Sequence, residues 1–280
     1  MKKILLLLFI FFEFFIIIYS KEVINEFVFT INICIYSLMP TMFFQILFSN
    51  FLYTLRKEFF VPKFLYNFFN ISKDEFVIVL ISMFSGYPNN IKLLKNNCNE
   101  YLNYSTNFVN PLFLFVNVGL VYLHNIKLIL IVYMSHVISN FILLYIFKNK
   151  HIPSNNYTNF ENTYSDIIEN TIKTLVLIFS NLLFISLFLT IIKLTIPFNN
   201  YIIGIIEFSR GIYEISIMNI SLYLKGLLIL IIITFGSFSI HFQVISINCK
   251  IKYIKYLLYR LLNVLISVLI YLILIYIIYL

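Results

Sequence analysis

Two short stretches of the chain place small, polar and helix-breaking residues inside otherwise apolar runs. Ser85-Gly86-Tyr87-Pro88 interrupts a run that starts at Phe76, and Gly236 interrupts a run that starts at Gly226. A broken helix leaves backbone amides and carbonyls without helical partners. In a bilayer, such backbone is tolerated only where protein buries it or water reaches it. These groups could therefore bind a polar solute.

Polar side chains follow the first break closely. Asn89, Asn90 and Lys92 come directly after Pro88. If a new helix starts there, its first amides and the positive end of its dipole favour an anion. Lys92 fits two interpretations, a cation facing the solute and a side chain that reaches the lipid headgroups.

A comparable set follows the second break. Ser239 and Gln243 are four residues apart and share one helix face, whereas His241 points to another side. An ionisable side chain inside a membrane is costly and often functional. His241 therefore fits either a proton relay or a structural hydrogen-bond donor.

Two further groups combine polar residues at helical spacing. Asn110 and Asn117 are seven residues apart and share a helix face, which contacts either a solute or a neighbouring helix. Glu207, Arg210 and Glu214 are three and four residues apart and can form an ion-pair chain along one helix. The alternative is that this segment lies at the surface and that its charges are solvated.

Together these groups predict a solute path with two cations, Lys92 and Arg210, supplying positive potential. The candidate solute-binding residues are Ser85, Gly86, Tyr87, Asn89, Asn90, Lys92, Asn110, Asn117, Glu207, Ser209, Arg210, Gly236, Ser239, His241 and Gln243.

The sequence offers little for catalysis or metal binding. Its cysteines, Cys34, Cys98 and Cys249, are isolated, which argues against a disulfide framework, a zinc site or an iron–sulfur cluster. It contains no metalloprotease, nucleophile-elbow or P-loop motif. We expect no catalytic residue, no metal and no cofactor, and therefore no enzyme.

The composition indicates the elements that must position these residues. Of 280 residues, 61% are apolar or aromatic and 11% are charged, and the mean hydropathy is +0.94. A soluble domain carries about 25% charge, so a soluble enzyme is excluded. The chain is predicted to be an all-α, polytopic membrane helix bundle. Its net charge of +8 fits basic cytoplasmic loops rather than nucleic-acid binding.

The hydropathy pattern divides the chain into an anchor and two halves. Residues 1–22 form an N-terminal membrane anchor, 23–147 a first half, 148–166 a polar linker and 167–280 a second half. Each half contains an apolar run broken at glycine. Matching interrupted segments in two halves are typical of transporters built from repeats. We therefore expect two structural repeats, each with a broken or re-entrant helix.

Individual spans carry further expectations. Phe27 to Tyr53 is a span kinked at Pro40. Phe108 to Tyr122 and Lys127 to Phe147 are predicted to be ordinary spans. Gly226 to Ile247 either crosses fully or forms a hairpin, and the side of the C-terminus stays open. Basic residues near the N-terminus and in the first loops place the N-terminus in the cytoplasm of a multi-pass cell-membrane protein.

Four stretches carry a resemblance to a known family. Ser85-Gly86-Tyr87-Pro88 with Lys92 is similar to S-G-Y-P-x-G-A-K, and Asn110-Pro111 through Val118-Gly119 is similar to N-P-x-x-x-x-x-x-V-G. Glu207 to Gly211 is similar to E-x-[ST]-x-G, and Phe235 to Val244 to F-G-G-x-S-x-H-x-Q-V. In this order, they resemble the nucleoside-recognition (Gate) domain family of bacterial membrane proteins, and most closely its sporulation integral membrane protein (YlbJ-like) branch.

The resemblance implies transport of a small metabolite. The solute would be nucleoside-like or a small anion such as dipicolinate, and the membrane one that surrounds a spore. Asn90 and Ile91 replace the family's Gly-Ala pair, and Ser237 replaces its second glycine, so the solute's identity does not carry over. The expected partners are this solute and the bilayer, not nucleic acid, with a homo-oligomer left open. The alternative is a non-transporting membrane assembly or scaffold protein.

Overall fold

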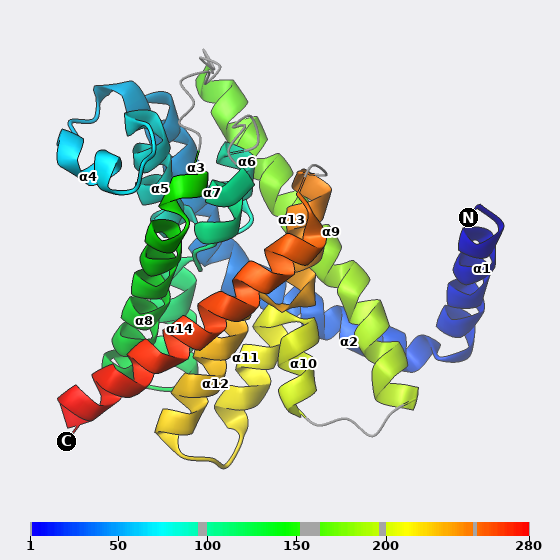
Figure 1. The fold of residues 1–280 in the computed structure, drawn as a ribbon. Coiled ribbons are helices and arrows are strands. Elements are labelled where there is room, and N and C mark those ends of the chain that lie inside the picture. The colour runs from blue at the N-terminus through cyan, green and yellow to red at the C-terminus, as the bar shows by residue number, and fades with distance from the viewer. Residues whose placement is uncertain (1, 95–99, 152–162, 196–199, 249–250, 280) are drawn as a thin grey trace.

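The chain folds into helices only, as far as the structure describes it. The computed structural model describes residues 2–94, 100–151, 163–195, 200–248 and 251–279, and no strand occurs among them (Figure 1). The prediction of an all-α, polytopic membrane bundle is confirmed. Five helical stretches of this part are long and apolar enough to cross a membrane: Ser20–Thr54, Ile126–Ile146, Tyr164–Thr195, Leu222–Ile247 and Tyr253–Ile278.

The N-terminal part forms two helices joined by a short turn. Helix α1 covers Lys2–Ile18. Helix α2 (Ser20–Ile33), a π-helical turn (Cys34–Leu38) and α3 (Met39–Thr54) then form one unbroken stretch of 35 residues. Pro40 lies near the start of α3, directly after the wider π-helical turn, which accommodates the missing proline N–H.

The first half then doubles back in a hairpin. After a 3-10 turn (Arg56–Glu58) and α4 (Lys63–Phe68), α5 (Lys73–Ser85) starts at a capping box and stops at Gly86. The short α6 (Asn89–Leu93) follows this break.

The next crossing is also broken, contrary to the prediction of an ordinary span from Phe108 to Tyr122. Helix α7 (Glu100–Ser105) leads into an extended stretch at 106–110 and then into a π-helix, Phe113–Tyr122. The cause is Pro111, because a proline excludes the preceding residue from the α-helical region and lacks the N–H that would continue the helix. Helix α8 (Ile126–Ile146) and a 3-10 turn (Lys148–Lys150) complete this half.

The second half contains a tighter hairpin. After α9 (Tyr164–Thr195), the helices α10 (Asn200–Ile206) and α11 (Phe208–Ile217) pack side by side and reverse at Glu207. Glu207 and Glu214 are buried. The alternative of a solvated surface segment is therefore wrong.

The last two crossings start at opposite ends of the molecule. Helix α12 (Leu222–Phe235) continues past Gly236 into α13 (Ser237–Ile247), and α14 covers Tyr253–Tyr279. The α12–α13 pair forms one stretch of 26 residues that runs from the lower to the upper end in Figure 1. Gly226 to Ile247 thus crosses fully, and α14 returns to the lower end, where the C-terminus lies (Figure 1).

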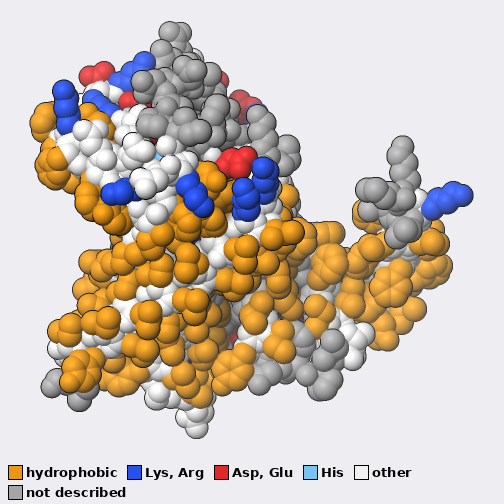
Figure 2. Space-filling view, in the orientation of Figure 1, with side chains coloured by type: hydrophobic (Ala, Val, Ile, Leu, Met, Phe, Trp, Pro, Cys, Tyr) orange, Lys and Arg blue, Asp and Glu red, His pale blue; other side chains and the backbone are white. Residues whose placement is uncertain are grey.

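Charged side chains gather at one end of the molecule. Figure 2 shows lysines, arginines and acidic residues at the upper end and a broad apolar surface below. At this end, Lys73 Nζ lies 3.0 Å from the Lys57 carbonyl oxygen, and Asn70 Nδ2 lies 3.2 Å from the Lys148 carbonyl oxygen. The basic segments 56–73 and 148–150 are therefore neighbours. Most of the predicted linker, 152–162, lies outside the described residues, and the proposed division into an anchor and two halves stays a prediction.

Candidate functional site

The interruptions of the helices meet in the interior. The Tyr87 amide donates to the Phe108 carbonyl oxygen at 2.8 Å, which joins the first hairpin to the broken crossing. The Tyr87 ring lies 5.4 Å from that of Phe208 at the tip of the second hairpin. A Cβ added at Gly236 would lie 3.6 Å from Asn107 Nδ2. Four breaks far apart in the sequence thus share one region.

Glycine is required at the first of these breaks. Gly86 has φ +70°, and an added Cβ would lie 2.5 Å from the Asn110 amide nitrogen. Such a contact is too close for any side chain, and the positive φ is strained for residues other than glycine. The absence of a side chain therefore lets the hairpin tip touch the backbone at Asn110.

The family resemblance implies two consecutive glycines at the second break, whereas this chain has Gly236 followed by Ser237. The structure accommodates the serine. Gly236 and Ser237 both have positive φ, 88° and 43°. The Ser237 hydroxyl donates a short hydrogen bond to the Gly204 carbonyl oxygen in α10. This bond helps to offset the strain of a non-glycine residue in the left-handed region.

The tip of the second hairpin is fully hydrogen-bonded. Glu207 carboxylate oxygens accept from the backbone amides of Ser209 at 2.9 Å and Arg210 at 2.5 Å, and from the Ser209 hydroxyl at 3.0 Å. The Phe208 amide donates to the Ser239 hydroxyl oxygen at 3.3 Å. Glu207, Ser209 and Ser239 thus cap and dock α11, which is a structural role.

The first hairpin and α13 instead present buried polar atoms without a partner. Buried polar groups in proteins are nearly always hydrogen-bonded, so each exception needs an explanation. Helix α6 packs against α13, which brings these groups into the same interior. We call the following residues of the first hairpin and α13 the break cluster, because each has a buried side-chain N or O atom without a hydrogen-bond partner in the described part: Ser85, Tyr87, Asn89, Asn90, His241 and Gln243.

Asn90 and Lys92 bind other parts of the protein. Asn90 Nδ2 donates to the Thr106 carbonyl oxygen at 2.5 Å. Lys92 Nζ donates to Thr174 Oγ1 on α9 at 2.8 Å and thus ties α6 to α9. Helix α6 has only five residues, and the amides of Asn90, Ile91 and Lys92 already bond to carbonyls of the break. Those amides are therefore occupied and do not form the expected anion site.

Asn110 and Asn117 hold helix ends and neighbours. Asn110 Oδ1 accepts from the Phe113 amide at 2.9 Å and caps the π-helix. Asn117 Nδ2 donates to the Ser37 carbonyl oxygen at 2.8 Å, in the π-helical turn before α3. Their expected common face does not arise, because the π-helix has a different period from the α-helix.

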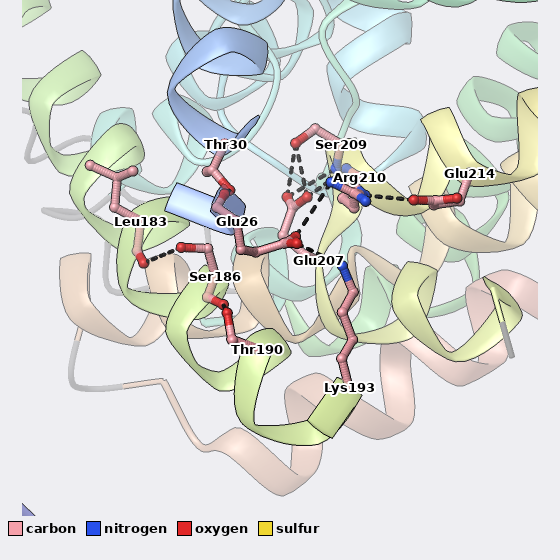
Figure 3. Close-up of polar contacts among 10 residues, drawn as sticks. All are labelled: Glu26, Thr30, Leu183, Ser186, Thr190, Lys193, Glu207, Ser209, Arg210 and Glu214. Carbon is pink, nitrogen blue, oxygen red and sulfur yellow. Dashed lines mark hydrogen bonds and ion pairs between the residues drawn. The ribbon is translucent and has the colours of Figure 1, made fainter. Parts of the chain in front are cut away.

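Arg210 forms the predicted bond to Glu214 but also binds residues that the sequence did not point to. Its Nε lies 2.7 Å from Glu214, and its Nη1 lies 3.4 Å from Glu26 on α2. Glu26 also pairs with Lys193 on α9 at 2.8 Å. Figure 3 shows these side chains converging between α2, α9 and α11. We call Glu26, Lys193, Arg210 and Glu214 the charge cluster.

Sequence reasoning did not point to Arg260. Arg260 lies in α14 and is completely buried. The Tyr256 ring lies 5.7 Å from Arg260 Cζ and 5.0 Å from the ring of His241, which brings Arg260 close to the break cluster. A signal existed, since Arg260, Asn263 and Ser267 are three and four residues apart in an apolar helix and are all fully buried.

Sequence reasoning also missed His136 on α8, whose side chain bonds to two of the interrupted segments. Its Nε2 accepts from the Val109 amide at 3.1 Å, and its Nδ1 lies 3.0 Å from Thr234 Oγ1 on α12. It therefore connects the extended stretch to the helix that ends at Gly236.

No group of three or more metal-binding side chains occurs among the described residues. Comparison with family models, with curated proteins and with solved structures finds no match to this chain.

Proposed function

We propose that the protein is a secondary transporter or facilitator for a small polar or anionic solute, which passes through the region where the breaks meet. The observation that carries this proposal is the break cluster, whose six members have buried polar atoms without partners among the described residues. Such atoms cost free energy unless something else bonds to them. A polar solute supplies those bonds.

The direction of the helices supports transport. The first hairpin, α5–α6, enters from the upper end and the second, α10–α11, from the lower end (Figure 1). The broken crossings α7–π-helix and α12–α13 also run in opposite directions (Figure 1). Inverted repeats with discontinuous helices at the midplane are a common transporter architecture. We infer that the two halves are such repeats and belong with the Gate family that the motifs resemble.

The orientation that we propose follows from charge. The end with the basic segments 56–73 and 148–150 faces the cytoplasm under the positive-inside rule. The N-terminal end of α1 points toward the same side in Figure 1, which puts the N-terminus in the cytoplasm and the C-terminus outside. The resemblance to the sporulation branch suggests a spore-surrounding membrane as the location.

The alternative function is that of a non-transporting membrane assembly protein. The bonds of Glu207 and Ser239 favour it, since they only hold helices together. The two functions differ in what happens when a polar atom of the break cluster is removed.

The test is uptake into phosphatidylcholine vesicles that contain the purified protein. Uridine, succinate, inorganic phosphate and dipicolinate serve as solutes. Gln243→Leu removes an amide that has no hydrogen-bond partner in the described part of the chain, so the protein should fold and insert normally while uptake is lost. Gln45→Leu makes the same change in α3, an unbroken helix, and should leave uptake intact. Wild-type vesicles that take up none of these solutes would favour the assembly function.

A further inference from the structure

Arg260 is a buried cation that has no acidic partner among the residues the structure describes. Its side chain is 0% exposed, and one nitrogen, Nη2, donates to the Tyr104 carbonyl oxygen. The other two, Nε and Nη1, carry three of the five guanidinium N–H bonds, and neither has an acceptor among the described residues. None of the ion pairs in this part of the chain includes Arg260.

This arrangement is costly, and arginine cannot relieve it by losing its proton. A guanidinium stays charged under all physiological conditions. Buried charges in proteins are therefore paired, hydrogen-bonded or kept for a function. Tyr256, one turn earlier in α14, contributes its ring at 5.7 Å from Arg260 Cζ. A ring face and one carbonyl compensate the charge only in part.

The position of Arg260 connects it to the breaks. The Tyr256 hydroxyl accepts from Asn107 Nδ2 at 2.7 Å, next to Gly236. The Tyr256 ring also lies 5.0 Å from that of His241. Tyr87, whose hydroxyl has no partner in the described part of the chain, is joined through its amide to the carbonyl of Phe108, the residue next to Asn107. The guanidinium thus borders the same interior as the break cluster.

We propose that Arg260 binds the negatively charged group, a carboxylate or a phosphate, of the transported solute, and that the Tyr87 hydroxyl donates to the same group. This assignment rests on the proposed transport function and narrows its substrate class to anions. Guanidinium N–H bonds match the paired oxygens of such groups. Arg210 does not take this role, because the carboxylates of Glu26 and Glu214 already pair with its charge, at 3.4 Å and 2.7 Å.

Thermal unfolding of purified protein in an uncharged sugar detergent tests the assignment without phosphate-bearing lipid. Succinate, inorganic phosphate and neutral uridine are added at matched ionic strength. For the wild type, succinate or phosphate should raise the melting temperature beyond sodium chloride alone. In Arg260→Gln the apparent Kd should weaken about 30-fold or more, and Arg260→Lys should lie between. Arg210→Gln, the matched control, should keep the anion response.

A second variant keeps the test decisive if Arg260→Gln does not fold. Tyr87→Phe removes only a hydroxyl without a partner among the described residues, so the unliganded protein should melt as the wild type does. Its anion affinity should fall about tenfold. Anion affinities that stay unchanged in Tyr87→Phe and Arg260→Lys would overturn the assignment.

The outcomes separate the two proposals. Uptake of uridine with no response to anions in wild type, or equal anion binding in wild type and Arg260→Gln, rejects the role of Arg260 and leaves transport standing. A wild-type protein that neither binds nor takes up any of the three probes rejects both. Both proposals are supported if the anion response is lost in Arg260→Gln but kept in the wild type and in Arg210→Gln.

Discussion

Two arginines within the helix bundle, Arg210 and Arg260, have opposite surroundings. Arg210 lies between Glu26 and Glu214, with its guanidinium carbon 3.6 Å from the centre of the Phe29 ring. Arg260 bonds to a single carbonyl oxygen and has no carboxylate partner in the described part of the chain. The neighbours of each arginine, rather than the residue type, decide its role. The charge of Arg210 is paired with carboxylates and joins helices, whereas Arg260 keeps guanidinium N–H groups available for a ligand.

The charge cluster is balanced within itself. It contains two carboxylates and two cations, and its three ion pairs connect α2, α9 and α11. Its side chains are between 11% and 27% exposed, so solvent screens them only partly. Such a network stabilises the packing of the second hairpin against its neighbours. It contributes no net positive potential to a solute path.

The largest expected effect comes from separating the two helices behind Arg210. In Gly211→Val, the new Cβ would lie 2.0 Å from Gly204 Cα, a contact that no side-chain movement relieves. Helices α10 and α11 must part, and the charge cluster disperses with them. We expect no monodisperse protein in size-exclusion chromatography.

Gly119→Ala is the matched control for this change. Its new Cβ would lie at an ordinary 3.6 Å from Ile129, so yield and elution should stay normal. A folded Gly211→Val protein would contradict the close approach of the two helices.

Removing the compensated arginine should have the next largest effect. Arg210→Gln leaves two partly buried carboxylates with one lysine, which should cost about 2 kcal/mol of unfolding free energy. Thermal melting in detergent measures this as a lower melting temperature. Adding Glu26→Gln should recover part of the loss, because the excess negative charge disappears. Additive losses in the double variant would show that Arg210 and Glu26 do not interact.

The uncompensated arginine should respond in the opposite direction. Without ligand, Arg260→Gln removes a buried charge that lacks an acidic partner among the described residues, so the unfolding free energy should stay the same or rise by about 1 kcal/mol. The same melting experiment without added anions measures it. If its melting temperature falls as far as that of Arg210→Gln, Arg260 is a structural cation and the contrast between the two arginines is lost.

The smallest effect is expected for an exposed ion pair that belongs neither to the charge cluster around Arg210 nor to the surroundings of Arg260. Glu169 and Lys173 on α9 lie 2.5 Å apart, with side chains 61% and 68% exposed. Lys173→Ala should change the unfolding free energy by less than about 0.5 kcal/mol. A larger shift would mean that the melting assay responds to surface charge in general, and the comparison of Arg210 with Arg260 would need matched salt conditions.

The helix breaks at glycine were predictable, whereas the others were not. Gly86 and Gly236 stand out because glycine interrupts long apolar runs, and the helices end at both positions. The reversal at Glu207 has no glycine or proline at its tip. The signal lay on either side, in Gly204 and Gly211, which allow two helices to touch. That use of glycine depends on a partner helix, which no local pattern specifies.

Residues of the candidate site could be predicted only where the signal lies close to them in the sequence. Ser85 and Tyr87 flank Gly86 and Gln243 follows Gly236 by seven residues in the sequence, and the structure leaves buried atoms of their side chains without partners among the described residues. The partners of Arg210 could not be inferred, since Glu26 and Lys193 come from distant helices. Arg260 follows Lys250, Lys252 and Lys255 in the sequence, and these lysines obscure the polar face that it shares with Asn263 and Ser267.

The contact between Gly204 and Gly211 limits how the second hairpin can move. No side chain separates the two backbones, so α10 and α11 cannot approach more closely at this point without a collision. Glu207, at the reversal between them, accepts hydrogen bonds from the amides of Ser209 and Arg210. If the proposed transport moves this hairpin, we expect α10 and α11 to move together and the ion pair between Arg210 and Glu26 on α2 to break.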